Sequence, residues 1–281
     1  MKVSAFAAPP YCAKLFIMSK TQKELAFLRD LYIETDWTER FTNLFDDNFK
    51  FTKEEKVLYV NAGTGSHALA LRKKLKEKVE LFAQSETKEL LKIAQAKADA
   101  VKADVQFSND FQKGKFDAVL ADASLVKPSD LKDFLTRIVE LSEKQVVFFL
   151  PTAGSFGDIF SFLWETFLNL DLLEHGAEVE RLLTEIPTSS KVEEIAENLN
   201  LISVEAITKS EFFEYSTGEE FINAPLFADF LFPVWLDFLN QTERNKVVKK
   251  LAKIIDDECQ ELSFRVMVKA TLIVGEKSNE S

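Results

Sequence analysis

The sequence predicts an α/β protein with a doubly wound, mostly parallel sheet of seven strands. Three observations support this fold class. Short apolar runs alternate with amphipathic helical stretches over residues 55–150, which is typical of βαβ units. The run at 145–150 is rich in Val, Phe and Leu, as in a strand buried on both faces of a parallel sheet. The length of 281 residues accommodates one large α/β domain with peripheral helices.

Helices are expected before the first strand. Residues 20–33 carry apolar side chains at helical spacing, and a second amphipathic piece covers 37–45. Further upstream, Pro9 and Pro10 break the apolar run, so no targeting segment is predicted. Residues 1–17 are therefore interpreted as an extension that contributes little to the fold.

Strands and helices then alternate in order. Val57–Val60 reads as the first strand and stops at a glycine turn, after which Leu69, Leu71 and Leu75 mark an amphipathic helix. The next predicted strands are 79–83, 104–108, 116–121 and 145–150, with helices at 86–100 and 129–142.

After Pro151 the predicted elements are mostly helical. They are helices at 158–173 and 191–198, a strand at 201–207 that 212–215 prolongs, helices over 217–258, and a strand at 264–274. The apolar window 156–173 contains Asp158, Glu165 and Asp171, which argue against a membrane span. The predicted division is an N-terminal extension with helices over 1–52 and an α/β domain over 53–281.

The composition excludes several classes of function. The net charge of −11 argues against a general nucleic-acid binder and against docking on anionic membranes, because both need a surplus of Lys and Arg. Cys12 and Cys259 cannot form a disulfide framework, and His67 and His175 are too few for most histidine-based zinc sites. A cytoplasmic protein without a metal is therefore expected.

The glycine turn after the first strand is the most informative motif. Only 8 of the 281 residues are glycine, yet Gly63 and Gly65 stand one residue apart between a strand and a helix. A ligand can approach the main chain closely where there is no Cβ, and the helix that follows offers free N–H groups. The alternative interpretation is a tight turn in which the glycines only permit close packing.

At this point the order of elements resembles that of class I S-adenosylmethionine (SAM)-dependent methyltransferases. Gly63 and Gly65 match the last two glycines of the family's loop motif, and Phe116–Leu120 resembles its fourth-strand signature. The segment 264–274 fits the family's last strand, which is antiparallel. The resemblance covers roughly residues 55–275. It implies a Rossmann-like sheet of seven strands with helical additions at the N-terminus and over 217–258.

The resemblance also implies a cofactor site and an activity. SAM would lie across the glycine turn, with its ribose near Gln84 and its adenine near Asp110, and the fourth strand would end beside the reaction site. The cofactor-binding positions expected from the family are Tyr59, Asn61, Ala62, Gly63, Gly65, Ala83, Gln84, Asp110 and Asp122. The implied reaction is methyl transfer to a small or carrier-borne acceptor, by proximity and alignment, with no single catalytic residue identified.

The sequence departs from the family on the cofactor side. Tyr59 stands where the family usually has an acid, Asn61 replaces the first glycine, and Ala83 and Gln84 stand where the ribose-binding carboxylate is expected. Glu86 is close by but is expected to lie within the following helix. These departures support the alternative function, a methyltransferase-like fold without catalysis that serves as a binding or assembly module.

Two further hypotheses remain open. The spacing of Gly63, Gly65 and Ala68 also satisfies a dinucleotide-binding fingerprint, but the acid that this motif needs downstream is missing. His67, in the first turn of a helix, is a candidate base near the cofactor. Its alternative is a structural role.

The helical stretch 217–258 contains an aromatic segment, Ile222–Leu239, with few charges. Such a segment must pack on the body or on another molecule. It is interpreted either as an ordinary helical layer or as a lid that closes an apolar acceptor pocket above Gly63 and Asp122, with Phe230 and Trp235 as its contacts.

Overall fold

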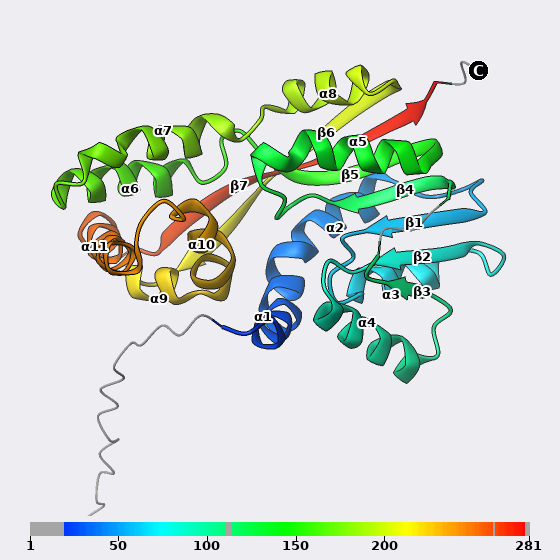
Figure 1. The fold of residues 1–281 in the computed structure, drawn as a ribbon, viewed down its shortest axis with the longest axis horizontal. Helices are drawn as coiled ribbons and strands as arrows, with labels where there is room; N and C mark the ends of the chain where they lie inside the picture. The colour runs from blue at the N-terminus through cyan, green and yellow to red at the C-terminus, as the bar shows by residue number, and fades with distance from the viewer. Residues whose placement is uncertain (1–19, 111–113, 261, 279–281) are drawn as a thin grey trace, which may run out of the picture.

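A seven-stranded sheet of order β3-β2-β1-β4-β5-β7-β6 forms the centre of the molecule (Figure 1). The computed structural model describes residues 20–110, 114–260 and 262–278. The strands are β1 Lys56–Val60, β2 Glu80–Gln84, β3 Gln106–Ser108, β4 Phe116–Asp122, β5 Ser142–Thr152, β6 Leu201–Tyr215 and β7 Phe264–Lys277. Cys12 and the predicted extension over 1–17 lie outside the described residues.

The strand directions confirm the predicted fold class. β1 pairs in parallel with β2 and β4, β2 with β3, and β4 with β5, whereas β7 is antiparallel to both β5 and β6. β6 is one strand of 15 residues. It is continuous through the segment between the two predicted pieces, and a register shift between Ile202 and Glu205 accommodates Ser203 at a φ of 52°.

The alternation of side chains along the strands produces two hydrophobic cores, one on each face of the sheet. In β1, Val57 and Tyr59 belong to the larger core, and Leu58 and Val60 belong to the smaller one. The smaller core is closed by α5 (Leu131–Leu141) and α8 (Ser189–Asn198). The helices that contribute to the larger core include α2 (Glu39–Asn48), α3 (Ser66–Lys74), α6 (Gly157–Asn169), α7 (Gly176–Glu185) and α11 (Gln241–Cys259).

The N-terminal helices form one unbroken helical segment, whereas the sequence predicted two pieces. α1 (Gln22–Leu28) begins at a capping box made by Thr21 and Glu24. It continues without a break into the π-helix η1 (Arg29–Thr38) and then into α2. We call η1 the π-helical segment; its Ile33 and Trp37 are 1% exposed and pack into the larger core.

The remaining helices connect the strands. They are α4 (Lys88–Val101), whose N-cap is Thr87, the short 3-10 turns η2 (Pro128–Asp130) and η3 (Leu173–His175), and the four helices between β6 and β7. Those four are α9 (Gly218–Asn223), η4 (Leu226–Leu231), α10 (Phe232–Trp235) and α11, which we call the helical insert. Within the described ranges, no helix combines the length and the apolar character needed to cross a membrane.

The helical insert packs as part of the larger core. Phe227, Phe232 and Trp235 are buried, and the Trp235 ring lies 5.0 Å from the ring centroids of both Phe156 and Phe160. The aromatic segment therefore forms a helical layer over the sheet, as one of the two sequence interpretations expected. Phe230 is only partly buried.

Close approach of α9 to α11 generates a prediction about Gly218. A Cβ added at Gly218 would lie 2.1 Å from the carbonyl oxygen of Ala252, which is backbone and cannot rotate away. We expect Gly218→Ala to lower the free energy of unfolding by about 3 kcal/mol. The measurement is urea denaturation followed by circular dichroism.

The matched control is Gly157→Ala at the start of α6, where a Cβ would meet no atom within 4 Å. This change should alter stability by less than about 1 kcal/mol, because alanine favours a helix and meets no obstacle here. Equal losses in the two variants would contradict the close packing of α9 on α11.

Candidate functional site

A cavity of about 490 Å³ lies at the carboxyl ends of β1, β4 and β5, and residues of the helical insert form part of its lining. Its polar end contains Arg29, Asn61, Glu86 and Asp122. Its apolar walls include Leu150, Phe156, Phe160, Leu182, Phe230 and Trp235. The polar end adjoins the glycine turn, so the cavity and the predicted cofactor crevice share residues.

The glycine turn, residues 61–65, folds tightly because three of its residues have positive φ. Asn61, Gly63 and Gly65 have φ values of 56°, 57° and 79°. A Cβ on Gly63 would lie 2.2 Å from Glu34 Oε1, and one on Gly65 would lie 2.8 Å from the Phe107 ring. Each glycine thus makes room for a side chain of the protein itself.

The N–H groups of the turn are also occupied. Gly63 N donates to Glu86 Oε2 at 3.1 Å, and Thr64 N donates to Glu34 Oε1 at 3.2 Å. Gly65 N donates to the carbonyl oxygen of Ala62 at 2.9 Å. None of these three groups is left for a ligand in this arrangement.

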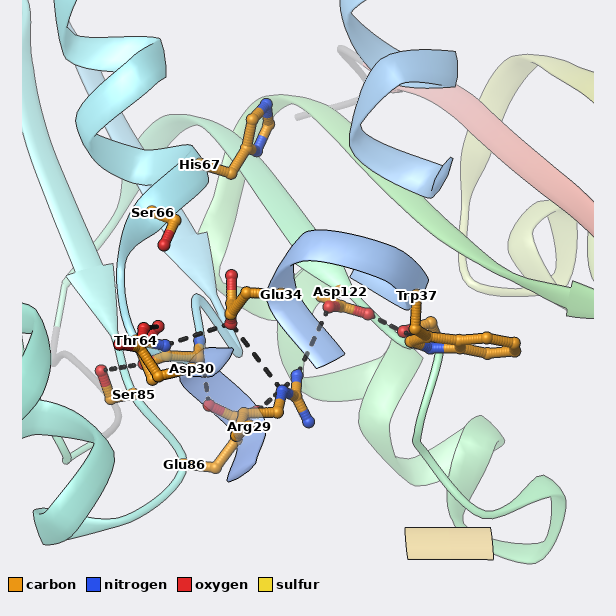
Figure 2. Close-up of polar contacts among 12 residues, drawn as sticks. Arg29, Asp30, Glu34, Trp37, Thr64, Ser66, His67, Ser85, Glu86 and Asp122 are labelled. Carbon is orange, nitrogen blue, oxygen red and sulfur yellow. Dashed lines mark hydrogen bonds and ion pairs between the residues drawn. The ribbon is translucent and has the colours of Figure 1, made fainter. Parts of the chain in front are cut away.

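Arg29 lies at the centre of a buried charge cluster (Figure 2). Its Nη2 is 3.4 Å from Glu86 Oε1 and 3.7 Å from Asp122 Oδ2, and its Nε is 3.8 Å from Glu34 Oε1. Arg29, Glu34 and Asp122 are each less than 8% exposed. Three carboxyl groups therefore surround one guanidinium.

Burial raises the pKa of two carboxyl groups of the cluster. It raises the pKa of Glu34 to about 7, although Arg29 and the Thr64 N–H oppose the shift. Burial also raises the pKa of Asp122, against the effect of Arg29. The pKa of Arg29 is raised by Glu86, Asp122 and Glu34, which together outweigh its own burial.

Two buried polar atoms of the cluster are unsatisfied. Among the described residues, Arg29 Nε and Asp122 Oδ2 have no hydrogen-bond partner. The other oxygen of Asp122, Oδ1, accepts from Ser124 N at 2.7 Å. Ser124 Oγ in turn accepts from Trp37 Nε1 at 2.9 Å, which fixes the end of β4 to the π-helical segment.

A second polar network holds the π-helical segment over the turn. Thr64 Oγ1 donates to Asp30 Oδ1 at 2.6 Å. Lys97 Nζ, from α4, pairs with Asp30 and donates to Thr64 Oγ1 at 3.0 Å and to Ser66 Oγ at 2.8 Å. The π-helical segment is therefore attached through Asp30 both to the glycine turn and to α4.

The structure places the predicted site residues in different surroundings. Asn61 and Asp122 line the cavity, and Asn61 Nδ2 donates to the carbonyl oxygen of Asp122 at 3.0 Å. Gln84 Oε1 accepts from Asn61 N at 3.0 Å, and Asp110 is exposed beyond β3. Ala62, Gly63, Gly65 and Ala83 are buried, but they do not line the cavity.

Tyr59 and His67 lie apart from the cavity. The Tyr59 hydroxyl is buried 3.2 Å from His67 Nδ1, and His67 Nε2 lies 3.5 Å from Asp46 Oδ1. In Figure 2 the His67 ring points away from the charge cluster. This environment is the one that a structural role for His67 would give.

Sequence reasoning missed Arg29 and Glu34 and misplaced Glu86. Arg29 and Glu34 are five residues apart, a spacing that a π-helix aligns and that a search at α-helical spacing does not select. Glu86 was expected within a helix, but α4 begins at Lys88. The carboxylate of Glu86 is therefore free to reach back to the turn.

The residues present do not fit SAM in the manner that the resemblance implied. The surface over Gly63 is covered by Glu34, the turn N–H groups are bonded, and Arg29 fills the space between Glu86 and Asp122. A cofactor lying across this turn would have to displace the side chains of Glu34 and Arg29.

Comparison with known proteins finds solved structures of similar fold. No protein-family model matches the chain, and no curated protein matches it. The solved structure of the YcgJ protein from Bacillus subtilis is similar, with a TM-score of 0.53 and 16% identity, over 85% of this chain and 98% of that one.

A second similar structure is phosphoethanolamine N-methyltransferase 2 from Haemonchus contortus, solved with phosphomonomethylethanolamine and S-adenosylhomocysteine. Its TM-score is 0.52 at 13% identity, over 91% of this chain and 57% of that one. The present chain therefore spans little more than half the length of the Haemonchus contortus protein. Likeness at such identities concerns the fold. The chain has the Rossmann-like fold of class I SAM-dependent methyltransferases across most of its length.

Proposed function

We propose that this chain is a small-molecule-binding protein on a methyltransferase fold, whose SAM crevice is closed by its own π-helical segment. The observation that carries the proposal is the position of Glu34. Its carboxyl accepts from Thr64 N and lies where a Cβ on Gly63 would be, which is the surface that a bound cofactor would need.

Opening the crevice would cost much of the local packing. Arg29 and Glu34 belong to the same segment as Ile33 and Trp37, which are buried in the larger core. Each such side chain contributes roughly 1.5–3 kcal/mol when it is fully buried. Displacing the segment would also break the contacts of Asp30 with Thr64 and Lys97.

The cofactor side also lacks its usual partners. No carboxylate stands at Ala83 or Gln84 to accept from a ribose diol, and Gln84 Oε1 already accepts from Asn61 N. Each lost charge-assisted bond weakens binding by about 1.5–3 kcal/mol. The missing partners and the closed crevice act in the same direction.

The adjacent cavity supports a binding role. Its volume of about 490 Å³ falls within the usual range of small-ligand pockets, roughly 300–1,000 Å³. It combines apolar walls with a polar end, which is the usual composition of such pockets. Phe230 and Trp235 bring the helical insert into its lining.

The competing function is methyl transfer from SAM to a small or carrier-borne acceptor. One observation favours it: three carboxyl groups around one guanidinium would suit a cofactor that carries positive charge. This function requires the π-helical segment to move away from the turn. Binding of the cofactor product therefore separates the two functions.

Titration with S-adenosylhomocysteine is the direct test. We expect the wild-type protein to give no heat and no thermal shift at millimolar ligand, because Glu34 and Arg29 occupy the crevice. Micromolar binding by the wild type would refute the closed crevice. The variant Glu34→Ala clears the space over Gly63 and frees the Thr64 N–H, and any gain of binding in it would identify Glu34 as the obstacle.

The raised pKa of Glu34 generates a second prediction. Its pKa is about 7 in the folded protein and 4.5 in the reference state, so the folded protein holds this proton more tightly. The free energy of unfolding should therefore fall as the pH rises from about 4.5 to about 7, and flatten above that. The loss is about 3.5 kcal/mol at most, at roughly 1.4 kcal/mol per pH unit.

Glu34→Gln provides the comparison, because the glutamine oxygen still accepts from Thr64 N and does not titrate. Urea denaturation of both proteins across this pH range cancels the contributions of titrating groups that do not interact with Glu34. The stability of the variant relative to the wild type should increase with pH. A constant difference would show that Glu34 is not held protonated by its burial.

A further inference from the structure

The charge balance at the polar end of the cavity indicates what kind of ligand it accepts. Several charged residues of the lining are paired with other charged residues. Arg181 Nη1 lies 3.0 Å from Glu185 Oε2. Asp229 Oδ1 lies 2.6 Å from Lys20 Nζ, and Lys127 Nζ lies 4.0 Å from Asp237 Oδ2. The lining residues Arg29, Glu86 and Asp122 remain at the polar end, with two carboxyl groups to one guanidinium.

The carboxyl group that lacks a hydrogen-bond partner for one of its oxygens is buried. Asp122 is 3% exposed, and its Oδ2 has no hydrogen-bond partner among the described residues. Glu34 adds a third carboxyl group on the far side of Arg29. An anionic ligand would enter a site where Arg29 is already surrounded by carboxyl groups, whereas a cationic ligand would be attracted by the carboxyl groups of Asp122 and Glu86, which line the cavity.

The apolar walls define the rest of the ligand. Phe156, Phe160 and Trp235 form an aromatic cluster with ring centroids 5.0–6.1 Å apart, and all three line the cavity. Such a wall accommodates an aryl or alkyl body. A metal ion is a poorer occupant, since the described residues contain no group of three His, Cys, Asp or Glu arranged to hold one.

We infer that the cavity binds a hydrophobic organic amine, with its ammonium group at Asp122 and Glu86 and its apolar body against Phe156, Phe160 and Trp235. This inference rests on the proposed function, in which the cavity is the binding site. It assigns the ligand's chemical class.

Three probes of one shape test the inference: 4-phenylbutylamine, 4-phenylbutan-1-ol and 4-phenylbutyrate. They differ in the charge of the terminal group. Isothermal titration of the wild-type protein with each probe therefore measures how affinity depends on that charge. The amine should bind about tenfold or more tighter than the alcohol, and the acid should bind weakest. An acid that binds as well as the amine, equal binding of amine and alcohol, or no binding of the amine at millimolar concentration would overturn the inference.

Variants locate the ammonium group. Asp122→Asn should weaken binding of the amine by about tenfold or more and leave binding of the alcohol nearly unchanged. Glu86→Gln, at a more exposed side chain, should act in the same direction if Asp122→Asn does not fold. Asp99→Asn is the matched control, since Asp99 is exposed on α4 and does not line the cavity. Unchanged amine affinity in Asp122→Asn, or in Glu86→Gln if Asp122→Asn does not fold, would overturn the placement.

S-adenosylhomocysteine is titrated in the same series to separate the two claims. Its binding by the wild type would refute the closed crevice, whatever the amine does. If S-adenosylhomocysteine does not bind and the acid or the alcohol matches the amine, the proposed binding function stands and the inferred ligand class is wrong.

Discussion

Burial of the Arg29 guanidinium dictates how this end of the molecule is assembled. A charge removed from water costs several kcal/mol unless opposite charges surround it, so Arg29 needs carboxyl groups close by. Glu34 comes from the same helical segment, Glu86 from the turn after β2, and Asp122 from the end of β4. One side chain thus connects three regions that are far apart in the sequence.

The π-helical geometry makes this arrangement compatible with the core. A spacing of five residues places Arg29 and Glu34 together near the glycine turn, while Ile33 and Trp37 from the same segment are buried against the sheet. The same π-helical segment therefore covers the glycine turn and packs into the larger core. The π-helical segment thereby covers the main chain of the glycine turn at Gly63 and Thr64.

In the proposed function, the binding surface is shifted along the sheet edge from the glycine turn to the cavity. The turn is covered, but the ends of β4 and β5 remain open to a cavity that the helical insert completes. Asp122 belongs to both places, since it faces Arg29 and also lines the cavity. Trp235 of the helical insert belongs to the larger core and also lines the cavity.

The sequence alone determined the alternation of strands and helices, the position of the glycine turn and the helical insert, because periodicity, turn residues and breakers act over a few neighbouring residues. It could not decide what fills the space beside Gly63. Glu34 and Thr64 are 30 residues apart, and Asn61 and Asp122 are 61 apart. Only tertiary packing brings such residues together, so the occupation of the crevice by Glu34 and Arg29 was decided by the folded structure.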